Sequence, residues 1–79
     1  MNFMLGAITL FAGDYAPAGF AKCDGSLLSI GKNTMLFSIL QTTYGGDGIS
    51  NFALPKLPSV AGAIYIIAIS GNYPGRSSE

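Results

Sequence analysis

The residues of this chain that could do chemistry are few, and the most conspicuous group is a Gly-rich loop, TTYGGDGIS, at residues 42–50. A phosphate-binding loop would need Lys-Ser or Lys-Thr after its glycines, but an isoleucine follows the last one. A calcium loop needs several oxygen ligands at alternating positions, and Asp47, Ser50 and Asn51 supply too few. We therefore interpret the loop as structural, with glycines in conformations closed to other residues and Asp47 accepting hydrogen bonds from backbone amides.

A second group of reactive types lies at the CDG sequence of residues 23–25. Asp24 and Asp14 could form a carboxylate pair for glycoside hydrolysis only across a sugar-sized cleft, which a chain of this size is not expected to hold. Cys23 could act as a nucleophile only beside a base, and the chain contains no histidine. We expect Asp24 to form a turn with Gly25 and Cys23 to be buried.

These observations predict that the protein is not an enzyme and has no cofactor and no metal site. The residues to which we assign a structural role, in the turn and in the loop, are Asp24, Gly25, Tyr44, Gly45, Gly46, Asp47 and Gly48.

Size and composition limit the remaining function classes. The chain has 79 residues, of which 49% are apolar and 10% are charged. A soluble domain usually has roughly 25% charged residues, so part of this surface must be apolar or neutral. A chain this short is also only marginally stable by itself. Both properties predict a homo-oligomer or a larger partner.

The charge pattern argues against two other classes. The formal net charge is zero, and the charges are scattered along the chain. A nucleic-acid interface would need a basic stripe, so no nucleic-acid partner is expected. The apolar run AGAIYIIAIS at residues 61–70 is shorter than the roughly 20 residues of a membrane-spanning helix. The N-terminal run FMLGAITLFAG follows no Lys or Arg, so we predict neither a signal peptide nor membrane insertion.

The elements that must position these residues are short. Alternation and β-branched content predict strands near residues 6–11, 20–22 and 27–30, an extended piece at 52–54 ended by Pro55, and a last strand at 63–70. Helical spacing of apolar residues predicts one helix over about residues 32–41, with Ser29 as a candidate N-cap, although MLFSIL alone also fits a strand. The predicted class is α+β, a small sheet with one short helix, in a single domain of residues 1–79.

A series of short motifs then carries a resemblance to a known family. The motifs are GAI at residues 6–8, FAG at 11–13, APAGF at 16–20, CDG at 23–25, LF at 36–37, TYGGDG at 43–48 and FALP at 52–55. In order and spacing they resemble the phage tail collar domain, a family that includes small bacterial proteins called microcystin-dependent. The resemblance implies a small α+β unit, generally trimeric, in a phage tail fibre or a tail-like machine.

The sequence departs from the family pattern at several places. Gln41 stands where glycine is common, and Asn51 stands where threonine is common. KLPSV occupies residues 56–60 in place of an acidic or amide residue followed by an Arg-Gly-Arg type segment. The apolar strand then returns almost at once, as though the family's central insertion had been removed. Some tail-fibre tips bind metal through histidines, and that property is not expected here.

Two functions follow as expectations. The first is an oligomeric collar or tip module that joins tail fibre or baseplate proteins. Its expected location is a virion or tail-like particle, or otherwise the bacterial cytoplasm. The second is an oligomeric module that binds a cell-surface glycan, with Tyr15, Tyr44 and Tyr73 as candidate ligand contacts because they lie beside turn residues. Phe20, Phe52 and Tyr65 are expected to pack internally. Residues 71–79 are expected to be a flexible tail or to order against a partner.

Overall fold

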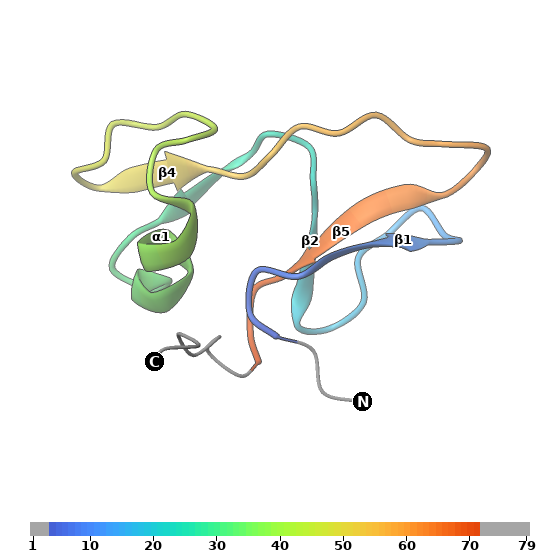
Figure 1. Ribbon diagram of the computed structural model, residues 1–79, viewed down its shortest axis with the longest axis horizontal. Helices are drawn as coiled ribbons and strands as arrows, with labels where there is room; N and C mark the ends of the chain where they lie inside the picture. Colours follow the sequence, from blue (N-terminus) through green and yellow to red (C-terminus); the bar gives the residue numbers. More distant parts are fainter. Residues whose placement is uncertain (1–3, 72–79) are drawn as a thin grey trace, which may run out of the picture.

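A computed structural model of the chain describes residues 4–71, which contain five strands and one helix (Figure 1). The elements run in the order β1 (Ile8–Phe11), β2 (Phe20–Lys22), β3 (Leu27–Ser29), α1 (Thr34–Leu40), β4 (Asn51–Ala53) and β5 (Ile64–Ala68). The α+β class is therefore confirmed. The strands form two antiparallel sheets, where we had expected one small sheet.

The first sheet has three strands in the order β1-β5-β2, so the last strand of the chain lies in the middle. The unbroken apolar run of β5 explains this central place, because a strand covered on both faces needs no polar alternation. Ile66, Ile67 and Ala68 are buried there. In β1, by contrast, Ile8 and Leu10 are exposed while the alternate residues are half-buried.

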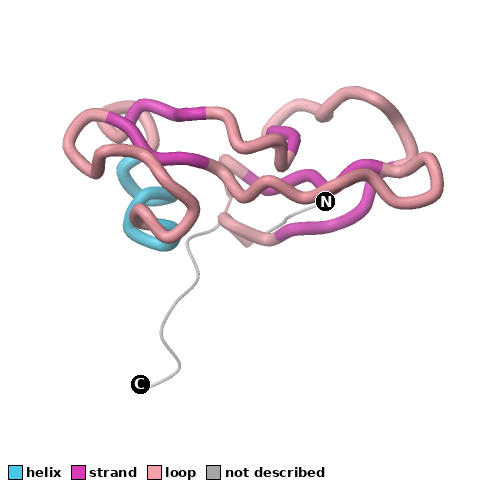
Figure 2. Tube along the Cα trace, turned by 90° about the horizontal axis from the view of Figure 1, so that it is seen from above, coloured by secondary structure: helices cyan, strands magenta, loops and turns pink. Residues whose placement is uncertain are grey.

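The second sheet pairs β3 with β4, and it lies with α1 at the other end of the molecule (Figures 1 and 2). Leu28 is opposite Phe52 in this pair. Two connecting segments, residues 23–26 and 54–57, run between the two ends of the molecule. They lie side by side and bond to each other through backbone groups. The Leu57 amide donates to the Cys23 carbonyl over 2.8 Å, and the Leu54 amide donates to the Ser26 carbonyl over 3.0 Å.

The helix begins later than the sequence predicts. Ser29 is paired with Asn51 in the second sheet, so it is not the N-cap, and that prediction was wrong. Asn33 takes the N-cap position without a side-chain capping bond, and its Nδ2 donates to the Ser29 carbonyl over 2.9 Å. Ser29 therefore belongs to strand β3, although its local propensity favours the start of a helix.

The core lies between the helix and the two sheets. Its buried members are Leu5, Cys23, Leu36, Leu40, Phe52, Leu54 and Ile67. Phe52 is completely buried, and its ring centroid is 5.4 Å from that of Phe37 on the helix. Because α1 has only seven residues, its stability depends on this packing rather than on helix propensity. The helix ends at Gln41, which has a positive φ of 50°.

Candidate functional site

The Asp47 carboxylate organises the Gly-rich loop. Its Oδ1 accepts hydrogen bonds from the backbone amides of Ile49 (2.8 Å), Ser50 (2.9 Å) and Asn51 (3.1 Å). Its Oδ2 accepts a hydrogen bond from the Ser50 hydroxyl over 3.2 Å. In return, the Asn51 side-chain oxygen accepts from the Asp47 amide over 2.9 Å. The carboxylate is therefore used by the loop itself, as the structural interpretation requires.

Hydrogen bonding also sets the charge of Asp47. The amide of Ile49, followed by those of Ser50 and Asn51, lowers the pKa of the carboxyl from 3.8 to about 2. The side chain is exposed, so its neighbours rather than burial control its ionisation. The group stays ionised at neutral pH and acts as an acceptor, not as an acid catalyst.

The loop packs directly against strand β4. The Ala53 amide donates to the Gly45 carbonyl over 3.0 Å, and the Gly48 amide donates to the Asn51 carbonyl over 3.0 Å. Gly46 has a φ of 94°, and a side chain there would overlap the backbone of Phe52. Glycine is needed at this position both for its conformation and for the close approach of the two backbones.

The Asp24 turn lies where the two connecting segments bond to each other. Oδ1 of Asp24 accepts from the Ser26 amide over 3.0 Å, and hydrogen bonds from the side chain and then the backbone of Ser26 lower the pKa of Asp24. Gly25 has a φ of 82° and donates its amide to the Pro55 carbonyl over 3.3 Å. The stem of Lys56 lies over Gly25, 3.4 Å from the position of a Cβ on that glycine. Asp24 is thus a turn former that also leaves a carboxylate on the surface.

Cys23 is buried, as expected, with 3% of its surface exposed. Burial, followed by the charge of Asp24, raises the pKa of its thiol. The thiol is therefore protonated at neutral pH and is a poor nucleophile.

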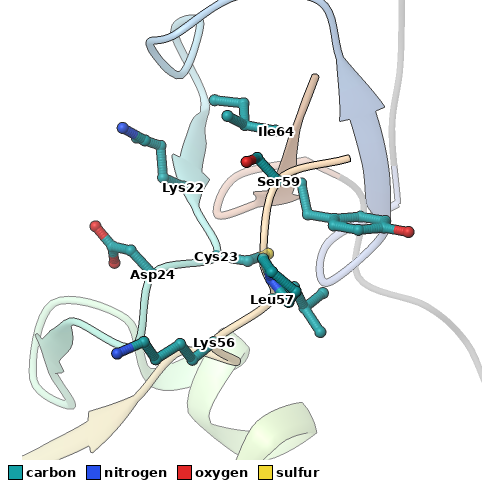
Figure 3. A pocket seen from close by; sticks show the side chains of 9 residues that line it. Lys22, Cys23, Asp24, Lys56, Leu57, Ser59 and Ile64 are labelled. Atoms are coloured by element: carbon teal, nitrogen blue, oxygen red, sulfur yellow. The ribbon is translucent and has the colours of Figure 1, made fainter. Parts of the chain in front are cut away.

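An open hollow of about 540 Å³ lies beside this turn (Figure 3). Its lining comes from three segments that are distant in the sequence, with Lys22 and Asp24 in the first, Lys56 and Leu57 in the second and Tyr65 in the third. Sequence reasoning did not group these residues, and no local motif could have done so. Backbone bonds bring them together, because the Cys23 amide donates to the Tyr65 carbonyl over 3.0 Å while the Cys23 carbonyl accepts from Leu57.

The two proposed ligand-contact tyrosines that lie within the described residues are far apart. Tyr15 and Tyr44 are 62% and 50% exposed, and their loops lie toward opposite ends of the molecule in Figure 1. The ring of Tyr15 packs edge-on against Phe11, with 5.6 Å between the centroids. Neither tyrosine lines the hollow. Tyr73 lies outside the described residues.

Residues 4–71 contain neither a candidate metal centre nor a candidate membrane span. In that part of the chain, no group of three or more His, Cys, Asp or Glu residues is placed to hold a metal ion. No helix there has the length and apolar character needed to cross a bilayer.

The fold is that of a small α+β domain in which Asp24 and Asp47 each bond the backbone of their own turn. The family model of the phage tail collar domain matches residues 6–61, and the chain belongs to this family. That family is one of structural domains associated with phage tails. The match includes both the Asp24 turn and the Gly-rich loop. A search among curated proteins gave no match to the chain.

Proposed function

We propose that this chain is an oligomeric collar or tip module of a phage tail fibre or tail-like assembly, with a trimer as the expected state. Family membership supports the tail context. The observation that carries the oligomeric part is strand β1, which has an unpaired edge within residues 4–71 because it pairs with β5 alone. Its sequence ITLF has no charge, and Ile8 and Leu10 are 41% and 47% exposed.

Strand β1 lacks the features that prevent an edge strand from pairing with another chain. Edge strands of soluble proteins are usually blunted by a charged side chain, a proline or a bulge. An apolar, uncharged edge is favourable instead for contact with another chain, through backbone bonds and side-chain burial together. The net charge of zero gives no long-range repulsion between copies. On this proposal residues 1–79 act as one unit; the tail for which we expected either flexibility or ordering against a partner lies, after residue 71, outside the described residues.

Native molar mass, measured by light scattering after size exclusion over a range of concentrations, tests the proposal. A stable trimer is the expected result. A monomer that persists at micromolar concentration would contradict it. Binding to purified tail fibre or baseplate proteins would then be tested with the oligomer.

A second candidate function is binding of a cell-surface glycan by the same oligomer. The exposed rings of Tyr15 and Tyr44 favour it, because aromatic faces stack on sugars and an oligomer repeats weak contacts. A glycan array tests this function. Signal that is reduced by Tyr44→Ala supports it, whereas a blank array with an intact oligomer contradicts it.

A further inference from the structure

A row of apolar side chains crosses one face of the first sheet at the end away from the helix. Leu10 of β1 lies opposite Tyr65 of β5. The Tyr65 carbonyl accepts from the Cys23 amide, and the Cys23 carbonyl accepts from the Leu57 amide. Residues that lie opposite each other in antiparallel pairs project from the same face. Cys23 is buried within this row, whereas Leu10 and Leu57, at its two ends, are 47% and 36% exposed.

Two more exposed side chains lie on the same face. Ile8, which is 41% exposed, is two residues before Leu10, and alternate residues of a strand share a face. Val60, which is 45% exposed, pairs with Ala63 in the turn that precedes β5. Ala63 is two residues before Tyr65, so this pair extends the row toward the turn. We call Ile8, Leu10, Leu57, Val60 and Tyr65 the apolar face.

Charged side chains at this end of the molecule lie on the opposite face. Lys22 and Asp24 flank Cys23 in the sequence, so both project away from its face. Lys56 pairs with Asp24 in an antiparallel bridge and therefore projects with it. Figure 3 shows Lys22, Asp24 and Lys56 on one side of these segments, with Leu57 pointing away from them. This end of the sheet thus has one charged and one uncharged face.

The protomer covers much of the charged face but leaves the apolar face open. The Lys22 ammonium group donates to the Asp14 carbonyl over 3.4 Å, which places the loop after β1 beside the charged face. Ile66 shares that face with Lys22 and is only 2% exposed. On the apolar face the core buries Ile67, but Leu10 lies beyond this cover. The apolar face is therefore the one available to a partner.

Three kinds of partner can be compared with this face. A charged peptide would find no opposite charge among its members. A lipid surface is usually bound by apolar side chains with basic residues beside them, and Lys22 and Lys56 lie on the other face. A second copy of the chain brings an equally uncharged face. Ile8 and Leu10 also join this face to the β1 edge, where contact between copies is already proposed, so the observations favour a second copy.

We propose that copies of this chain pack through the apolar face, so that Leu57 and Val60 belong to the contact together with β1. In a cyclic oligomer, side chains near the rotation axis meet their own counterparts, and an uncharged apolar face suits that position. The proposal rests on the oligomeric module given above. It goes beyond that module because pairing at the β1 edge alone would extend the sheet and leave the apolar face exposed.

The test is the dissociation of two variants, followed by light scattering and sedimentation equilibrium over a range of concentrations. Leu57→Glu and Val60→Lys each place a charge on the apolar face. Each is expected to raise the concentration of half-dissociation at least about tenfold, because apolar burial is lost and like charges meet. Val60 lies in an exposed turn, so its variant keeps the test decisive where Leu57→Glu fails to fold.

Leu27→Glu is the matched control. Leu27 is 57% exposed in the second sheet, at the other end of the molecule. The same substitution there is expected to leave the native mass unchanged. Circular dichroism must show each variant folded.

The outcomes separate this inference from the proposed function. A natural chain that stays monomeric at micromolar concentration would overturn both. An oligomer weakened by Leu10→Glu but not by folded Leu57→Glu or Val60→Lys would keep the oligomeric module and overturn the apolar face as its contact. An equal loss with Leu27→Glu would show a general effect of charge and would also overturn it. Binding of a monomeric chain to phosphatidylcholine vesicles, lost in Leu57→Glu, would make the face a lipid contact instead.

Discussion

Gly46 and Phe52 meet backbone to backbone, so that a Cβ on Gly46 would overlap the Cα of Phe52 and lie 2.9 Å from the Asn51 carbonyl oxygen. Phe52 is also the completely buried residue whose ring packs against Phe37 of the helix. The Gly-rich loop and the core are thus connected through one residue of β4. Any displacement of that strand moves a core side chain.

A side chain at position 46 should therefore destabilise the fold strongly. We expect Gly46→Ala to lower the free energy of unfolding by about 3 kcal/mol or more, from the backbone overlap and the positive φ together. Gly62→Ala is the matched control, because Gly62 has a φ of 85° but no atom within 4 Å of its Cβ position. It should cost about 1 kcal/mol. Urea unfolding measures both variants, and an equal loss of unfolding free energy for Gly46→Ala and Gly62→Ala would contradict the overlap.

The Asp47 carboxylate should make stability depend on pH. Its pKa in the folded chain is about 2, below the ordinary 3.8, so the ionised form is favoured by folding. This stabilisation is present above the ordinary pKa and is lost as the pH falls through about 2. We expect the difference in Tm between the natural chain and Asp47→Ala to shrink between about pH 4 and pH 2.

Asp47→Asn separates the charge of this side chain from its shape. It keeps an acceptor oxygen without a titrating group, so its Tm deficit should be smaller and should shrink over the same pH range. A deficit that stays constant with pH for both variants would show that the loop amides do not hold the carboxylate.

Replacing Gln41 by glycine should stabilise the chain. Gln41 ends the helix with φ 50° and ψ −140°, a conformation that glycine adopts without a steric penalty. We expect Gln41→Gly to raise the free energy of unfolding by about 1 kcal/mol, or Tm by roughly 4–8 °C. Gln41→Ala keeps a Cβ and should give no such gain. A lower Tm for the glycine variant would mean that the glutamine side chain stabilises the helix end.

A charge on the β1 edge should weaken the proposed oligomer. We expect Leu10→Glu to shift the native mass toward the monomer, because like charges would meet at the edge and apolar burial would be lost. Ile49→Glu is the control, since Ile49 is 86% exposed on the Gly-rich loop. Circular dichroism must show both variants folded. An unchanged mass for folded Leu10→Glu would exclude β1 as the contact.

Cys23 should resist modification in the folded chain. Its thiol is 3% exposed and its pKa is raised by burial, so little thiolate is accessible. We expect a thiol reagent to label it at the rate of unfolding and much faster in denaturant. Rapid labelling under native conditions would contradict a buried, protonated thiol.

Local sequence signals determined much of this protein. β-branched alternation located β1, and apolar helical spacing located α1 within two residues at its start. The Asp-Gly pairs marked both turns, because an aspartate that bonds amides a few residues ahead needs no distant partner. With no histidine to activate it, Cys23 is predicted to be a core residue, and it is buried.

Only the tertiary structure decided the features that depend on residues far apart in the chain. Ser29 looked like a helix cap until its pairing with Asn51 placed it in a sheet, and the division into two sheets has no local signal. The hollow likewise exists because backbone bonds bring Cys23, Leu57 and Tyr65 side by side. Short strands carry too little sequence pattern to specify the strands with which they pair. Pairing is set instead by the arrangement that buries the apolar side chains together.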